Sequence, residues 1–176
     1  MAERVKKRSE IREQDTWKLE DMIASPEKFE ELADGVEERI PGYETYRGKL
    51  GSSADLLKSY LEFDESMDET ISLLYAYAMQ KRDQDTSVSE NQALVSRVQS
   101  LAVKAMAASS FAQPEILEIP DETMNGFLET DELKAYKLQI ERLLAKKPHM
   151  LSEKEEAILA SASEIAHTSH HRHKSL

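Results

Sequence analysis

Residues 67–105 read MDETISLLYAYAMQKRDQDTSVSENQALVSRVQSLAVKA and hold two apolar stripes on either side of a short polar turn. Within each stripe the apolar residues recur at steps of three and four, which is the period of a helix that buries one face. The first stripe contains Met67, Ile71, Leu74, Tyr75 and Ala78, and the second contains Leu94, Val98, Leu101 and Ala105. Ser87 and Glu90 match the capping pattern of a helix start. We therefore predict one helix running toward Arg82 and a second over about residues 88–112.

Helix signals also precede this pair. Ser25 and Pro26 match the N-cap and the first turn of a helix. Pro41 removes a backbone donor and should kink or divide that helix, and Gly48 should end it. Ser53 matches the start of the next helix. The stripe expected to be buried in the first of these helices is Phe29, Leu32, Val36, Ile40 and Tyr43.

Further helix signals follow the pair. Pro114 should close the long helix, and a short element should begin at Pro120. Thr130 matches the cap of a helix that ends before Pro148, and Ser152 opens a last one. The apolar side chains expected on these elements are Met124, Phe127, Leu128, Leu133, Tyr136, Ile140, Leu143, Leu144, Ile158, Leu159, Ala162 and Ile165.

The composition agrees with a helical chain. Only 5 glycines and 5 prolines occur in 176 residues, so turn-forming residues are scarce. Hydrophobic residues make up 40% and charged residues 32%, which is the balance of a soluble globular protein with one core. Because each apolar stripe must be covered by another element, we predict an all-α fold, an antiparallel bundle of about six amphipathic helices.

Charge and cysteine content exclude several classes of function. The formal net charge is -11 and the basic clusters are short and terminal, so nucleic acid is not an expected partner. The absence of cysteine excludes disulfides, cysteine-ligated zinc and thiol catalysis. No apolar run approaches the length of a membrane span, and the charged N-terminus does not resemble a signal peptide. We expect a cytoplasmic protein without a membrane partner.

Four of the five histidines lie close together near the C-terminus. His167 and His171 stand four residues apart, like the zinc ligands of an H-E-x-x-H helix. If the helix continues this far, Glu164, His167, His170 and His171 could share one face. No H-E-x-x-H sequence, G-x-S-x-G elbow or glycine-rich phosphate loop occurs in the chain, and His149 is expected to be structural. We therefore predict no catalytic and no cofactor-binding residue. The candidates for adventitious metal binding only are His167, His170, His171 and His173.

Five segments, taken in order, resemble blocks of the N-terminal region of oligoendopeptidase F. They are DTWKLEDM at 15–22, YRGKLGSSADLL at 46–57, LLYAYAMQKRDQDTS at 73–87, FAQPEIL at 111–117 and YKLQIERLLAKKPHMLSEKEEAILASASEI at 136–165. A single helical segment of this kind recurs by chance, but five in the right order and at plausible spacing make a specific match. The resemblance covers about residues 8–166.

This resemblance implies a function for the chain. Oligoendopeptidase F belongs to the thimet oligopeptidase clan of zinc metallopeptidases, which cleave short peptides inside an enclosed, mostly helical cavity. The zinc ligands of that family lie in a C-terminal catalytic domain, on an H-E-x-x-H helix and at a downstream glutamate. The N-terminal region is a helical lobe that helps to wall the cavity. The chain is therefore expected to be inactive alone, and the catalytic domain is its expected missing partner. Zinc and short peptides are expected to bind only to full-length members of the family.

We predict three parts for the chain. Residues 1–14 form a flexible arm, residues 15–166 the helical lobe, and residues 167–176 a His-rich tail outside the family. In the tail, Thr168 stands where the family has the glutamate that activates water, and the chain ends before a third ligand. We interpret the tail as a frameshift, a premature stop or a cloning scar. A hypothesis from another class stays open: a stand-alone helical module that has kept the lobe, lost the protease and binds peptides or proteins.

A lobe without its catalytic domain should also expose apolar surface, because part of its surface would be covered in the complete enzyme. The last two predicted helices adjoin the point where the chain would enter that domain. The side chains expected on this surface are Tyr136, Ile140, Leu144, Ile158 and Ile165.

Overall fold

The computed structural model describes residues 10–12 and 15–147, and every regular element in these ranges is helical. The α-helices are α1 (Pro26–Arg39), α2 (Ala54–Gln84), α3 (Ser89–Ser109), α4 (Ala112–Glu118), α5 (Asp121–Leu128) and α6 (Lys137–Leu144). Two 3-10 helices, η3 (Leu19–Asp21) and η4 (Ile40–Thr45), flank α1. The predicted all-α class is confirmed, and the bundle of six is approximate because α4, α5 and α6 have only 7 or 8 residues each.

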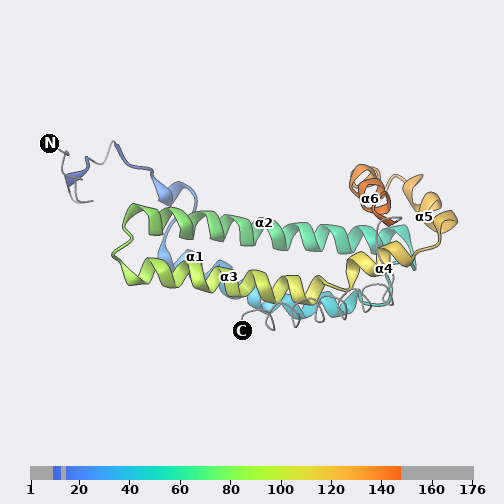
Figure 1. Cartoon of the computed structure of the whole chain (residues 1–176), viewed down its shortest axis with the longest axis horizontal. Helices are drawn as coiled ribbons and strands as arrows, with labels where there is room; N and C mark the ends of the chain where they lie inside the picture. The colour runs from blue at the N-terminus through green and yellow to red at the C-terminus, as the bar shows by residue number, and fades with distance from the viewer. Residues whose placement is uncertain (1–9, 13–14, 148–176) are drawn as a thin grey trace, which may run out of the picture. The chain divides into compact units, whose positions relative to one another are not determined.

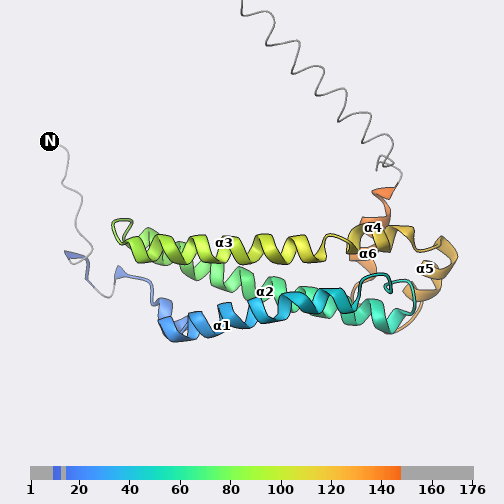
Figure 2. The ribbon, with the colours of Figure 1, turned by 90° about the horizontal axis from the view of Figure 1, so that it is seen from below.

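The three long helices form the body of the first of two units, which divide after Tyr136. α2 and α3 run antiparallel side by side, and α1 contacts both of them (Figures 1 and 2). The connection between α2 and α3 is short, as is usual for antiparallel neighbours in helical bundles. α4 and α5 follow at the end of α3, whereas α6 belongs to the second unit.

The core of the first unit lies between these three helices. Phe29 on α1 is fully buried, and its ring centroid lies 5.7 Å from that of Tyr77 on α2. Val98 on α3 is also fully buried. Among the described residues no polar or charged side chain is buried, and no buried side-chain nitrogen or oxygen lacks a hydrogen-bond partner. The stripes predicted from spacing therefore form one apolar core.

Local helix signals were read correctly at several ends. Ser25 accepts a hydrogen bond from the Lys28 backbone nitrogen at 3.3 Å, and Ser53 caps α2 in the same way. At Pro41 the α-helix has given way to η4, which begins at Ile40, so the predicted division is confirmed. Gly48 has φ of 76°, a left-handed conformation that favours glycine and ends this segment.

Three predicted ends are wrong for a shared reason. Ser87 does not cap α3, because its hydroxyl donates to Asp85 in the preceding turn and the N-cap is Val88. Pro114 does not close α3, which ends at Ser109; it lies in the first turn of α4, where a missing backbone donor is tolerated. Thr130 donates to the Phe127 carbonyl and so closes α5 instead of opening a helix. In each case the residue belongs to a different turn or helix from the one predicted.

Three of the predicted stripes need correction by one or two residues. Tyr75 is 40% exposed, and Tyr77 is buried in its place. Leu32 and Leu94 are half-buried, whereas their neighbours Ala33 and Val95 are buried. A position next to a true core position is also apolar in each of these helices, so spacing alone does not separate the two.

The predicted apolar surface near residue 136 is only partly described. Ile140 is buried, so it does not belong to an exposed surface, and Tyr136 and Leu144 are half-buried. Ile158 and Ile165 lie outside the described residues. Among the described residues, the large apolar side chains with at least half of their surface exposed are Trp17, Val103, Met106 and Leu138. None of the described helices has the length and apolar composition needed to cross a bilayer.

Candidate functional site

The histidines predicted as adventitious metal ligands cannot be placed in the fold. His167, His170, His171 and His173 lie outside the described residues, as does His149. In residues 10–12 and 15–147 no group of three or more histidine, aspartate or glutamate residues is arranged to hold a metal ion. The expectation that this chain has no catalytic or metal site therefore stays a prediction.

Two family-like segments meet where α4 contacts the loop before α2. The Glu115 carboxylate accepts hydrogen bonds from the backbone nitrogens of Gly48 at 2.8 Å and Leu50 at 2.6 Å. The Arg47 guanidinium lies 4.4 Å from the centre of the Phe111 ring. Segments 46–57 and 111–117 are thus joined by one carboxylate and one cation–π contact, which fix the loop around Gly48.

An aromatic cluster supports the same end of α2. The Tyr43 hydroxyl donates to Asp64 at 2.7 Å, and the Tyr43 ring packs edge-on against Phe63 with centroids 4.9 Å apart. Burial, and then the hydrogen bond to Asp64, raises the pKa of Tyr43 well above its usual value. Burial likewise raises the pKa of Tyr60. Both phenols stay protonated at neutral pH, so their role in this cluster is packing and hydrogen bonding.

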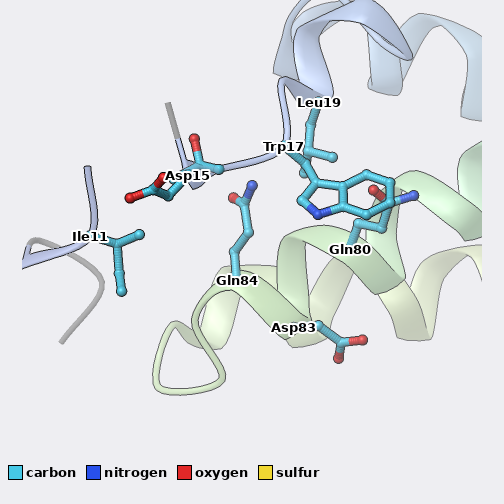
Figure 3. Close-up of a pocket in the computed structure, with 8 residues that line it drawn as sticks. Ile11, Asp15, Trp17, Leu19, Gln80, Asp83 and Gln84 are labelled. Carbon is cyan, nitrogen blue, oxygen red and sulfur yellow. The ribbon is translucent and has the colours of Figure 1, made fainter. Parts of the chain in front are cut away.

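The candidate binding site is a pocket between the N-terminal segment and the last turns of α2. It has a volume of about 670 Å³. Figure 3 shows the Trp17 ring over Gln80, with the Gln84 side chain pointing into the space between Trp17 and Asp15. The pocket therefore joins a second pair of family-like segments, 15–22 and 73–87, and the buried Leu19 borders it.

Several polar groups of the pocket have no partner among the described residues. Neither the Trp17 indole nor the Gln84 carboxamide makes a hydrogen bond there, and Trp17 is 79% exposed. The Gln80 amide nitrogen lies 3.4 Å from the Met22 sulfur, which is a weak acceptor. Such groups around an open hollow can bind a ligand that combines apolar surface with polar atoms.

The carboxylates of the pocket are each next to an arginine. Asp15 pairs with Arg12 at 2.9 Å, and Asp83 at the rim pairs with Arg82 at 2.8 Å. No lysine or arginine lines the pocket itself. Each arginine offsets the charge of its carboxylate, but the Asp15 and Asp83 side chains stay 48% and 61% exposed and can accept further hydrogen bonds.

Sequence reasoning missed this pocket. The segment DTWKLEDM resembles a block of the family, but nothing in its spacing predicts that it packs against residues more than sixty positions later. One signal was present, because Trp17 is the single tryptophan of the chain and does not fall on any predicted apolar stripe. An isolated large aromatic residue outside a helix is a candidate for a binding surface.

Comparisons with known proteins agree with the resemblance. The family model described as Oligopeptidase F matches residues 115–176. Oligopeptidase PepF of Bacillus subtilis is 42% identical over 159 residues, which cover 90% of this chain and 24% of that protein. The plasmid-encoded oligoendopeptidase F of Lactococcus lactis subsp. cremoris is 40% identical, over 91% of this chain and 27% of its own length. The chain thus spans about a quarter of the length of these relatives.

The matched interval of the family model also bears on the predicted parts of the chain. It runs to residue 176 and so includes residues 167–176, which were expected to lie outside the family. The match does not itself test a boundary at residue 166, which stays a prediction.

Solved structures share the fold. Oligoendopeptidase-F from Enterococcus faecium superposes with a TM-score of 0.65 and 32% identity, over 80% of this chain and 28% of that one. A structure from Chlamydophila abortus, at 24% identity, superposes with a TM-score of 0.80 over 90% of this chain and 27% of its own length, which shows the shared fold. This chain is therefore homologous to the N-terminal region of the oligoendopeptidase F proteins.

Proposed function

We propose that this chain acts as the N-terminal helical lobe of a zinc-dependent oligoendopeptidase that hydrolyses short peptides, and that it does not catalyse the reaction alone. The observation that carries the proposal is the match of 90% of the chain to proteins of which it covers only 24 to 27%. In this proposal the remaining region of such a protein is the partner that supplies zinc, the general base and the catalytic residues. We also propose that the protein works in the cytoplasm.

The lobe would contribute shape and rigidity to the enzyme. Its core holds α1, α2 and α3 together, and ion pairs join the outer faces of α1 and α3, where Arg97 binds Glu30 and Asp34. Glu115 holds the loop at Gly48 against α4. A wall of a substrate cavity has to keep its shape when the substrate binds, and these contacts would serve that purpose.

A chimeric enzyme tests the proposal. The region of Bacillus subtilis PepF that matches this chain is replaced by residues 8–166 of the chain, and hydrolysis of an internally quenched short peptide is measured with and without a chelator. We expect chelator-sensitive turnover by the chimera, and none by the isolated chain or by PepF without the matching region. A folded but inactive chimera, or chelator-sensitive turnover by the purified chain, would contradict the proposal.

The alternative function is a stand-alone helical module that binds peptides or proteins. One observation favours it: the first unit has its own apolar core, with no buried polar side chain among the described residues. The genomic sequence downstream of the gene separates the two hypotheses, because an encoded H-E-x-x-H in another frame favours the truncated lobe. Its absence favours the module.

A further inference from the structure

We propose that the pocket around Trp17 is a subsite for the cationic side chain of an arginine or lysine residue in a peptide. The peptide as the ligand class rests on the proposed function, whereas the preference for a cation comes from the pocket itself. This site lies wholly on the first unit and is formed by Asp15, Trp17, Leu19, Gln80, Asp83 and Gln84.

The first argument is the exposure of an aromatic face. Trp17 is 79% exposed and its ring forms one side of the pocket, over Gln80 (Figure 3). Tryptophan has the most favourable ring for a cation, and guanidinium groups stack on it more often than ammonium groups do. A side chain with an alkyl stem would also cover the apolar surface that Trp17 presents.

The second argument is the charge around the pocket. The lining includes two carboxylates, Asp15 and Asp83, and no cationic side chain. The whole chain carries a formal net charge of -11, so the surrounding field also attracts cations. Arg12 and Arg82 each contact one carboxylate, but both carboxylates stay accessible to solvent, so an incoming guanidinium can share them. An anionic side chain would meet repulsion from the same groups.

The third argument is the set of free hydrogen-bonding groups. The Gln84 carboxamide points into the space between Trp17 and Asp15 and makes no hydrogen bond to another described residue (Figure 3). Its oxygen can accept from a guanidinium, and its nitrogen can donate to a peptide carbonyl. The pocket thus offers an acceptor for the side chain and a donor for the backbone of the same residue.

The experiment uses the intact chain, in which Trp17 is the only tryptophan and therefore reports on this pocket alone. Its fluorescence is titrated with Nα-acetyl-arginine amide and with Nα-acetyl-citrulline amide, which has nearly the same shape but no charge. We expect saturable binding of the arginine compound, about fivefold or more tighter than the citrulline compound, because the cation–π and carboxylate interactions are lost together. Equal binding of both compounds, or no saturable change, overturns the proposal.

Matched variants locate the cation. Asp15→Asn and Asp83→Asn should each weaken binding of the arginine compound by about twofold to fivefold, as expected for exposed charge pairs. Asp68→Asn is the control, because Asp68 is an exposed acid on α2 about 22 Å along the helix from Asp83. If the preference for arginine is the same in all three variants, the cation binds elsewhere and the proposal is wrong. The chimera experiment does not depend on this result, so the two proposals fail separately.

Discussion

The contact between Glu115 and the loop at Gly48 gives the sharpest test of how the lobe is held together. The Glu115 carboxylate accepts two backbone hydrogen bonds from a segment more than sixty residues earlier. Glu115→Gln removes the charge and one of the two acceptor oxygens while it keeps the size of the side chain. The carboxamide can then serve only one backbone nitrogen, and its NH₂ group faces the other donor.

The magnitude follows from the burial of the two bonds. Hydrogen bonds to charged groups contribute about 1.5–3 kcal/mol each when shielded from water. The hydrogen bond to Leu50 is partly buried and should contribute about 1.5 kcal/mol to the free energy of unfolding. The hydrogen bond to Gly48 is exposed and should contribute about 0.5 kcal/mol. Because glutamine retains one acceptor, we expect Glu115→Gln to lower the free energy of unfolding by about 1–2 kcal/mol.

Urea denaturation followed by circular dichroism at the helical band measures this change. Glu118→Gln is the matched control, since Glu118 is an exposed acid of the same helix and should change the free energy of unfolding by less than about 0.5 kcal/mol. A thermal melt should show a loss of about 3–5 °C for Glu115→Gln. If Glu115→Gln and Glu118→Gln are equally stable, the carboxylate does not hold the loop and the reasoning is refuted.

Three further predictions concern the backbone, the charge pairs and the pH dependence. Gly48→Ala should lower the free energy of unfolding in urea by about 1–2 kcal/mol, because Gly48 has a φ of 76°. Gly35→Ala, on α1 with open space around it, should raise the free energy of unfolding by about 0.5–1 kcal/mol. The opposite order of stability would refute the left-handed conformation of Gly48. Arg97→Gln should lower the free energy of unfolding by about 0.5–1 kcal/mol at low salt. In about 1 M NaCl, where the ion pairs to α1 are screened, it should change the free energy of unfolding very little. A change that is the same at both salt concentrations would mean that Arg97 acts by packing. Partial burial, followed by the hydrogen bond to Glu65, raises the pKa of Tyr136 to about 12. The stability that protonated Tyr136 contributes is thus present below about pH 10 and lost as the pH rises toward 12. The urea midpoint of the unaltered chain should therefore fall over this pH range, and it should fall less steeply for Tyr136→Phe. The same dependence on pH in both proteins would contradict this.

The helices and several of their ends could be predicted from the sequence because the signals for helices are local. The spacing at Val98 and Leu101, the caps at Ser25 and Ser53 and the positive φ of Gly48 each depend on residues within one or two turns. A helical hydrogen bond joins residues four apart, so such patterns need no knowledge of the rest of the chain. The all-α class and the long α3 therefore followed from the sequence, and the resemblance to oligoendopeptidase F was read from the order of the segments.

Tertiary structure decided where the local signals competed or where distant segments meet. Ser87 and Thr130 have side chains that can bond either to the turn before them or to the helix after them, and in the folded chain both bond to the turn. The pocket at Trp17 and the bonds of Glu115 to the loop at Gly48 join segments more than sixty residues apart, and no periodic pattern encodes which segments those are. The physical reason is that a helix fixes which residues share a face, but only the packing of several faces into one core fixes which helices meet.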